Sequence, residues 1–210
     1  YRGDRITIYK ANEVILLLSA PTYYKLKYPQ YKGRDYINLT RNAISQAAKK
    51  SYNSLLKAHI KEYSSYFDRC TLSLCTRGDN LPTDQRITRI KNGAADPHLC
   101  ELIFQFGRYL LISSSRPGTM PANLQGIWAN KTKTPWNSDY HTNVNIQMNY
   151  WPAEVTNLSD CHLPFFDLVE SLVKPGHKPA NIQYDMDGWV VHPITNIWGY
   201  TSPGESSSWG

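Results

Sequence analysis

Four carboxamide side chains at alternate positions are the feature of this sequence best suited to chemistry. They lie among aromatic residues in the stretch YHTNVNIQMNYWPAE (residues 140–154) and are Asn143, Asn145, Gln147 and Asn149. An extended backbone would put all four amides on one face, whereas a helix would pair them at spacing i, i+4. Because asparagine favours helix caps, we expect an extended entry through residues 141–145 and a helix to about Leu158. By composition alone, backbone capping and ligand binding explain the row equally well.

Charged and aromatic residues divide the chain into two parts. The net charge is +6, but 19 of the 23 lysines and arginines lie in residues 1–127. Residues 128–210 carry four lysines against eight acidic residues, and they contain all six tryptophans. A mildly acidic, tryptophan-rich region matches a neutral polyhydroxylated ligand such as a sugar, whose C–H faces stack on aromatic rings. The same region is a poor match for a phosphate backbone, so we predict a carbohydrate partner and no nucleic acid.

Several classes of enzyme lack their characteristic motifs here. The sequence contains no GxSxG, HExxH, GxxxxGK(S/T) or GxGxxG motif, and its six histidines are scattered. The four cysteines lack the spacing of a zinc site, and we expect them to be buried free thiols. We therefore predict no metal and no organic cofactor. No apolar run reaches the ~18–20 residues that span a bilayer, so no membrane partner is expected either.

Apolar periodicity predicts a mainly helical chain that starts with strands. Residues 6–18 have the pattern of strands, residues 21–36 form a connecting segment, and a long helix begins at about Leu39. A strand-like interruption at 70–75 precedes a short helix that is capped by Thr83 or Asp84 and ended by Gly93. Further helices are expected from Asp96-Pro97, over 146–158 and over 161–173, with a loop at 113–126 and a loop-rich tail from Pro175. The abrupt start and end of this pattern predict a fragment of a longer protein.

A long stretch of the chain resembles the signature region of the glycoside hydrolase family 95 α-L-fucosidases. It reads RPGTMPANLQGIWANKTKTPWNSDYHTNVNIQMNYWPAEVTNLSDCHLPFFDLVESL (116–172), and GWVVHPITNIWGYTSPGE (188–205), LPTDQRI and FQFGRYLLISSSRPG fit the same family. The resemblance implies an N-terminal β-sandwich, a helical linker, an (α/α)6-barrel catalytic domain and a C-terminal β-domain. It places the last strands of the β-sandwich at residues 1–20, the helical linker at 21–75, and the first part of the barrel at 76–210.

The resemblance also implies a reaction. Members of the family hydrolyse terminal α-L-fucosides, especially α-1,2-linked ones, with inversion at the anomeric carbon. Their Asn-x-Asn pair matches Asn143 and Asn145, which would position the attacking water with help from an aspartate. His141 matches a residue that holds the fucose hydroxyls, and Glu205 matches a further sugar-binding carboxylate. The general acid and the assisting aspartate would lie beyond residue 210, so this chain alone is expected to be inactive and to need the rest of its polypeptide.

Another residue and other functions are also compatible with the sequence. Glu154 is a tempting acid, but its place in a helix beside Trp151 indicates a structural carboxylate. Gln147 and Asn149 are expected to be packing partners of the helix. Fucosylated glycans as substrates imply extracellular or periplasmic placement. Two alternatives stay open: an α-L-galactosidase, since L-galactose adds one hydroxyl at C6, and a non-catalytic sugar-binding relative.

Overall fold

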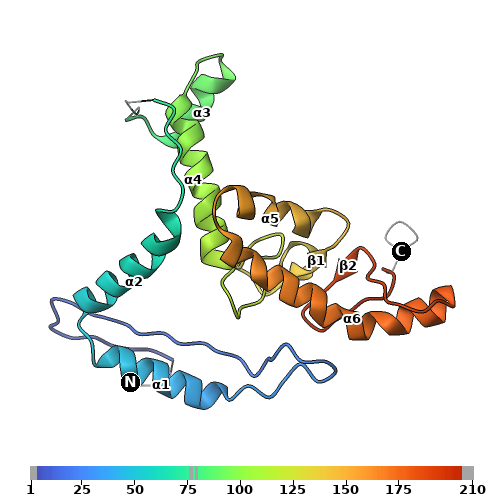
Figure 1. Cartoon of the computed structure of the whole chain (residues 1–210). Coiled ribbons are helices and arrows are strands. Elements are labelled where there is room, and N and C mark those ends of the chain that lie inside the picture. The colour runs from blue at the N-terminus through green and yellow to red at the C-terminus, as the bar shows by residue number, and fades with distance from the viewer. Residues whose placement is uncertain (1–3, 76–77, 79, 205–210) are drawn as a thin grey trace. The chain divides into compact units, whose positions relative to one another are not determined.

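The computed structural model describes residues 4–75, 78 and 80–204, and this part of the chain is mainly helical (Figure 1). Its helices are α1 (Tyr36–Ala48), α2 (Tyr52–Phe67), α3 (Thr83–Lys91), α4 (Pro97–Ser114), α5 (Asn145–Val155) and α6 (Leu163–Tyr184). It also has two 3-10 turns, η1 (Pro135–Ser138) and η2 (Ser159–His162), and two short strands, β1 (Tyr140–His141) and β2 (Ile194–Thr195). The predicted mainly α class is confirmed. None of the described helices is long and apolar enough to cross a membrane.

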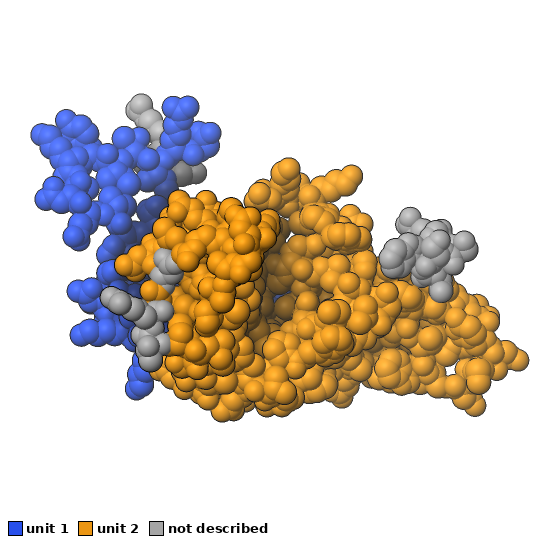
Figure 2. Space-filling view, turned by 90° about the horizontal axis from the view of Figure 1, so that it is seen from above, with its two compact units in different colours: residues 1–25, 32–61 blue, residues 26–31, 62–210 orange. Residues whose placement is uncertain are grey.

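The chain forms two compact units (Figure 2). One comprises residues 1–25 and 32–61, and the other comprises residues 26–31 and 62–210. In the first unit, Asp35 caps α1 by accepting hydrogen bonds from the Asn38 backbone N–H (3.1 Å) and from its Nδ2 (2.6 Å). No described residue of this unit is buried, so its helices form without a core of their own among these residues.

The structure corrects two strand predictions. It assigns no strand to residues 6–18, whose large apolar side chains are exposed. A strand needs a neighbour to satisfy its N–H and C=O groups, and the described residues supply none here. Residues 70–75 form no strand either, because the backbone N–H groups of Leu74 and Cys75 donate to Glu101 Oε1 instead.

The single long helix predicted from Leu39 is in fact two helices. α1 ends at Ala48 and α2 begins at Tyr52. Ser51 starts the second helix, because its Oγ accepts the Ser54 N–H (3.2 Å) in the manner of an N-cap residue. α1 ends at its own C-cap, Lys49, so a short break before Ser51 interrupts an apolar pattern that looks continuous in the sequence.

A buried arginine holds the carboxyl end of α2 within the second unit. Arg108 of α4 is 2% exposed. Its guanidinium donates to the carbonyls of Tyr66 (3.1 Å), Phe67 (2.7 Å) and Cys70 (2.7 Å). The last carbonyls of a helix have no partner within the helix, so this side chain satisfies groups that would otherwise lack donors.

The start of α4 follows the predicted capping pattern. Asp96 Oδ1 accepts the Leu99 N–H (2.9 Å), and Pro97 is the first helical residue. Asp96 also accepts two hydrogen bonds, of 2.7 and 2.8 Å, from the buried Arg86 of α3. These bonds lower the pKa of Asp96 to about 2. One carboxylate therefore caps α4 and joins it to α3.

The N-cap predicted for α3 is wrong, whereas the predicted stop is confirmed. Helical geometry begins at Thr83 itself, so Pro82 is the N-cap residue, and it provides no side-chain cap. Gly93 has a φ of 91°, and its N–H closes the last turn on the Ile90 carbonyl (2.9 Å). Glycine adopts this left-handed conformation without steric cost, which ends the helix.

The core of the second unit lies where α4, β1, α5, η2 and α6 meet (Figure 1). Its buried apolar residues are Leu111, Ile112, Ala122, Tyr140, Ile146, Tyr150, Ala153, Leu158, Cys161, Leu168 and Leu172. All four cysteines are free thiols as expected, but only Cys161 is buried. The core therefore surrounds β1 and the amino-terminal turn of α5, the region that carries the carboxamide row.

α6 extends well beyond its predicted end. It runs to Tyr184 and contains Pro175 and Pro179, whereas a loop-rich tail was expected from Pro175. Pro179 has no N–H to offer the Pro175 carbonyl one turn earlier, and Thr201 Oγ1 donates to that carbonyl instead (3.2 Å). The Val190 N–H likewise donates to the Gly176 carbonyl (3.2 Å). Contacts from a later segment thus compensate for the prolines, which the local sequence could not indicate.

Candidate active site

The candidate asparagine pair lies at the junction of β1 and α5 (Figure 1). β1 pairs antiparallel with β2, with His141 opposite Ile194. The next residue, Thr142, donates its N–H to the Pro193 carbonyl (2.8 Å) and its hydroxyl to the His192 carbonyl (2.7 Å). The turn before α5 is therefore anchored to a segment that lies much later in the sequence.

The predicted helix is confirmed, but the extended entry predicted for residues 141–145 is wrong beyond His141. Strand β1 is followed by a turn over residues 142–144, and α5 then begins at Asn145. The helix runs through Pro152 and ends at Val155 rather than at about Leu158. Asn145 is thus the first helical residue, and Val144 takes the N-cap position without a side-chain cap.

The four amides divide into two pairs. Gln147 Nε2 donates to the Thr142 carbonyl (2.6 Å), and Asn149 Nδ2 donates to a loop carbonyl (2.8 Å), so both are confirmed as packing partners. Asn143 is exposed and Asn145 is half-buried. Neither of these two side-chain amides makes a hydrogen bond within the described part of the chain. Their donors and acceptors are available to a ligand, and their role in positioning water stays a prediction.

A buried tyrosine ties α5 to the loop that follows α4. The Tyr150 hydroxyl accepts the Ala122 N–H (2.8 Å) and lies 2.8 Å from Ser115 Oγ. Ser115 Oγ in turn donates to the Cys161 carbonyl (2.8 Å), so Tyr150 is the donor toward Ser115. Burial raises the pKa of the Tyr150 phenol. Sequence analysis missed this network because hydroxyl partners far apart in sequence leave no periodic signal.

His141 has an acidic neighbour that sequence analysis also missed. His141 is buried at the end of β1, and Asp139, two residues earlier, is half-buried. An extended backbone directs side chains i and i+2 to the same side. Burial raises the pKa of Asp139, and its interaction with His141 opposes that rise. The Asp-x-His spacing ahead of the asparagines was the available signal, and the contact of His141 with a sugar stays a prediction.

Glu154 has the structural environment that was predicted for it. Its Oε2 accepts a hydrogen bond from Ser159 Oγ, and its Oε1 lies 2.9 Å from His162 Nδ1. The bond from Ser159, followed by that from His162, lowers the pKa of Glu154. A carboxyl group that ionises more readily than usual is poorly suited to donate a proton near neutral pH. Glu205, the other predicted carboxylate, lies outside the described residues.

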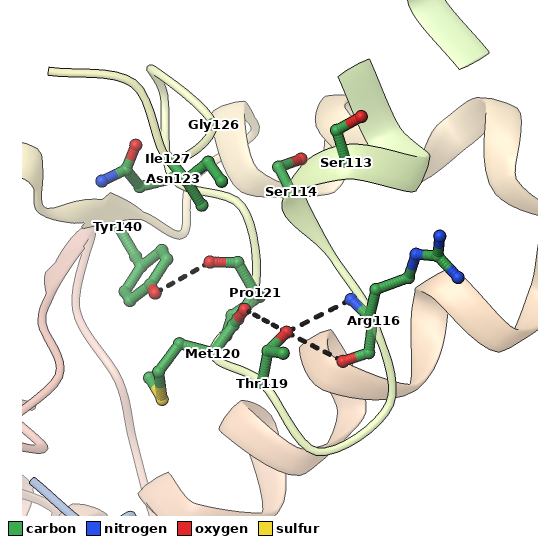
Figure 3. A pocket seen from close by; sticks show the side chains of 10 residues that line it. All are labelled: Ser113, Ser114, Arg116, Thr119, Met120, Pro121, Asn123, Gly126, Ile127 and Tyr140. Atoms are coloured by element: carbon green, nitrogen blue, oxygen red, sulfur yellow. Dashed lines mark hydrogen bonds between the residues drawn. The ribbon is translucent and has the colours of Figure 1, made fainter. Parts of the chain in front are cut away.

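Three cavities of the second unit are lined by residues other than the asparagine pair. One of about 300 Å³ lies between the end of α4 and Tyr140 (Figure 3). Tyr140 donates its hydroxyl to the Pro121 carbonyl (3.0 Å), and Thr119 Oγ1 bonds to the backbone of Arg116, so its walls are fixed by internal hydrogen bonds. The other two, of about 390 and 800 Å³, adjoin the loop that contains Gln125 and Trp128.

The arrangement at the β1–α5 junction suits orientation of a water molecule better than abstraction of its proton. Two amide oxygens can accept both hydrogens of one water and so direct its lone pair, but an amide is a very weak base. His141 and Asp139 precede the pair in the chain, and a role for them in holding sugar hydroxyls stays a prediction. Within the described residues, no group of three His, Cys, Asp or Glu could hold a metal ion.

Comparisons with known proteins agree in one family. The profile of the glycosyl hydrolase family 95 catalytic domain matches residues 51–210. Alpha-L-fucosidase 2 of Arabidopsis thaliana is 39% identical over 209 residues, which cover 96% of this chain and 25% of that protein. Probable alpha-fucosidase A of Aspergillus niger is 35% identical over 94% of this chain, and its namesake in Aspergillus oryzae is 38% identical over 81%. The chain spans about a quarter of the length of these relatives.

Proposed function

The chain belongs to glycosyl hydrolase family 95, and from this premise we propose that the full-length protein removes terminal α-L-fucosyl residues from glycans. The names of the matching plant and fungal relatives support a fucoside as substrate. We include α-1,2 linkage and inversion at the anomeric carbon in the proposal. Fucosylated glycans are found mainly outside cells, which is the reason for proposing an extracellular or periplasmic site of action.

One observation at the level of residues carries the proposed mechanism. Within the family-matched range, Asn143 lies in the turn before α5 and Asn145 follows it as the first helical residue. The turn is anchored at Thr142, and the two amides make no hydrogen bond to the described residues. Side chains held on a fixed turn with free acceptors can bind a water in one orientation, which lowers the entropic part of the barrier. In an inverting reaction that water attacks from the face opposite the leaving group.

Two further groups are needed, and the proposal assigns neither to residues 1–210. A carboxylic acid must protonate the leaving oxygen, and a carboxylate must assist the asparagines in accepting the proton of the water. Glu154 fits neither role, because Ser159 and His162 occupy it. His141 is assigned to the sugar hydroxyls, where a ring N–H donates to an oxygen of the fucose. The proposal assigns a second contact with the sugar to Glu205, by its match to the family pattern alone.

The proposed architecture is the first part of an (α/α)6 barrel, preceded by a helical linker and the end of a β-sandwich domain. In that domain residues 6–18 would gain the strand partners that the described residues do not supply. The surface of α5 supports further helices in the complete fold. Val144, Met148 and Val155 are 41%, 50% and 82% exposed, and with Trp151 they form one apolar stripe at helical spacing. Such a stripe is costly in water, and neighbouring barrel helices would cover it. The domain boundaries at residues 20 and 75 belong to the same proposal.

Product stereochemistry tests the proposal on the full-length protein. Proton NMR of the first turnovers of an α-1,2-fucosylated oligosaccharide should show β-L-fucose ahead of mutarotation, because inversion converts the α-linkage into the β-anomer. First-formed α-L-fucose would reject the water geometry assigned to the asparagines. Comparison of aryl α-L-fucoside with aryl α-L-galactoside under the same conditions tests the substrate. A higher kcat/KM on the galactoside would show that L-galactose, and not L-fucose, is the preferred sugar.

A further inference from the structure

A second candidate site lies in the loop between α4 and β1. Residues of this loop line a cavity of about 800 Å³, among them Trp128, Asn130, Lys131 and Lys133. The volume lies within the range of roughly 300–1,000 Å³ typical of small-ligand sites. Neither Asn143 nor any other residue of the proposed hydrolytic site lines it. The cavity therefore needs an explanation of its own.

The aromatic wall of this cavity is the ring of Trp128, which lies close to the backbone of Gly126. The Trp128 ring lies over Gly126, whose φ is 68°; a Cβ there would approach within 2.4 Å of the ring. A larger residue at position 126 would thus displace the indole. Trp128 is nonetheless 43% exposed, so part of its ring stays available to a ligand. An accessible indole is the usual platform for the C–H face of a pyranose.

Carboxamides fix the far side of the loop. Gln125 Nε2 donates to the Pro135 carbonyl (3.2 Å), and Asn123 Nδ2 donates to the Ser138 carbonyl (3.1 Å). These bonds anchor the loop on which the cavity is built. Asn130 supplies an amide to the lining. An amide can both donate to and accept from the hydroxyls of a sugar.

This cavity holds two of the few lysines in a mostly acidic stretch of the sequence. Residues 128–210 have four lysines and eight acidic residues, and two of those lysines, Lys131 and Lys133, line the cavity. Neither lysine forms an ion pair with a described residue. Two unpaired ammonium groups in an otherwise acidic part of the chain, beside a sugar-stacking ring, favour a ligand that is both a saccharide and an anion.

We propose that this cavity binds a carboxylate-bearing pyranose, that is, a uronic acid residue of a polysaccharide or glycan. The Trp128 ring stacks on the sugar, Lys131 and Lys133 hold the carboxylate, and Asn130 holds a hydroxyl. The proposal does not depend on the hydrolytic function. A single-stranded nucleic acid also combines stacking with phosphate contacts, but it uses several rings along a basic groove, and this cavity has one ring.

Direct binding measurements on the full-length protein test the proposal. The protein is made in a host that does not glycosylate Asn130, because Asn130-Lys131-Thr132 is an acceptor sequence. Tetragalacturonate is titrated by calorimetry, and its fully methyl-esterified form is the matched neutral ligand. The K131M/K133M variant removes both charges and keeps most of each aliphatic stem. The K174M/K178M variant removes the same charge from two exposed lysines of α6 and serves as control.

The expected result separates local recognition from general charge. K131M/K133M raises the Kd for tetragalacturonate about tenfold, as two partly exposed ion pairs allow, while K174M/K178M changes it less than about twofold. The methyl ester binds wild type as weakly as the acid binds K131M/K133M. Equal binding of acid and ester, unchanged affinity of K131M/K133M, or equal losses in both variants would overturn the proposal. So would tighter binding of a short single-stranded oligonucleotide than of tetragalacturonate. Because an unfucosylated ligand is used, failure here leaves the proposed hydrolysis untouched.

Discussion

Replacing Tyr150 with phenylalanine tests whether one buried hydroxyl keeps α5, and with it the asparagine turn, in place. The change removes a single oxygen from a residue that is 2% exposed. It takes the acceptor away from the Ala122 N–H and the donor away from Ser115 Oγ. Ser115 keeps its bond to the Cys161 carbonyl, so the loss is concentrated on the loop amide.

The size of the effect follows from these contacts. Ala122 is 4% exposed, and a buried N–H without a partner costs about 1–3 kcal/mol. Loss of the bond to Ser115 adds about 0.5–1 kcal/mol, since its oxygen keeps another partner. Together these losses lower the free energy of local opening of the loop by about 2–3 kcal/mol. At 1.4 kcal/mol per tenfold change, hydrogen exchange at the Ala122 amide should accelerate about 30- to 150-fold.

Hydrogen exchange of the full-length protein, followed by mass spectrometry of peptides covering residues 117–126, measures this directly. Tyr109→Phe is the matched control, because the Tyr109 ring is 41% exposed and its hydroxyl makes no hydrogen bond with a described residue. Exchange in the control should equal that of wild type. Exchange in Y150F within about twofold of wild type, or the same acceleration in Y109F, would refute the reasoning.

Three further outcomes are expected. The pKa of Asp96, about 2, lies below its ordinary value of 3.8, so the stability it gives α4 is present above about pH 4 and is lost as pH falls toward 2. After correction for the intrinsic pH dependence of amide exchange, the protection of amides at the start of α4 should therefore fall over that window in wild type. In D96N, which weakens the contact to Arg86, this protection should be low already at pH 6. Gln147→Met removes the bond to the Thr142 carbonyl and should lower kcat/KM on an aryl α-L-fucoside about 2- to 10-fold; an unchanged value would show that this bond does not position the turn. Cys161 is buried and its pKa is raised by burial, so it should resist a thiol reagent in the native protein and react in urea; fast native labelling would contradict the packing of η2.

The elements that could be predicted from the sequence are those whose ends are fixed locally. The start of α4 is an example, because Asp96 caps it and Pro97 occupies the first helical position. Gly93 ends the turn after α3 for an equally local reason. The strands predicted for residues 6–18 are wrong because a strand needs a neighbouring strand, and the local apolar pattern does not show whether one is present.

The extension of α6 could not be predicted because its cause is not local. Two prolines in five residues normally end a helix. Here the hydroxyl of Thr201 supplies the donor missing at the Pro175 carbonyl, and Val190 packs against Gly176, where a Cβ would approach the Val190 carbonyl within 2.9 Å. The residues around Pro175 do not indicate these contacts, because Thr201 and Val190 lie much later in the sequence.

In the candidate site too, some features could be predicted from the sequence and others depend on the fold. The sequence separated Gln147 and Asn149 from the other two amides, and their bonds to backbone carbonyls confirm a packing role. It could not reveal that Tyr150 holds the adjoining loop, or that Asp139 lies half-buried ahead of His141, because both depend on residues brought together by the fold. The roles of Asn143 and Asn145 remain the part that only an activity measurement can test.

That measurement is the turnover of an α-1,2-fucosylated oligosaccharide by full-length Asn143→Ala and Asn145→Ala variants. Since neither amide makes a hydrogen bond within the described residues, thermal stability should be unchanged. Loss of an oriented water should lower kcat about 10²- to 10⁴-fold in each variant. Asn181→Ala, at an exposed position of α6, should behave as wild type. Full turnover by either N143A or N145A would contradict the proposed mechanism.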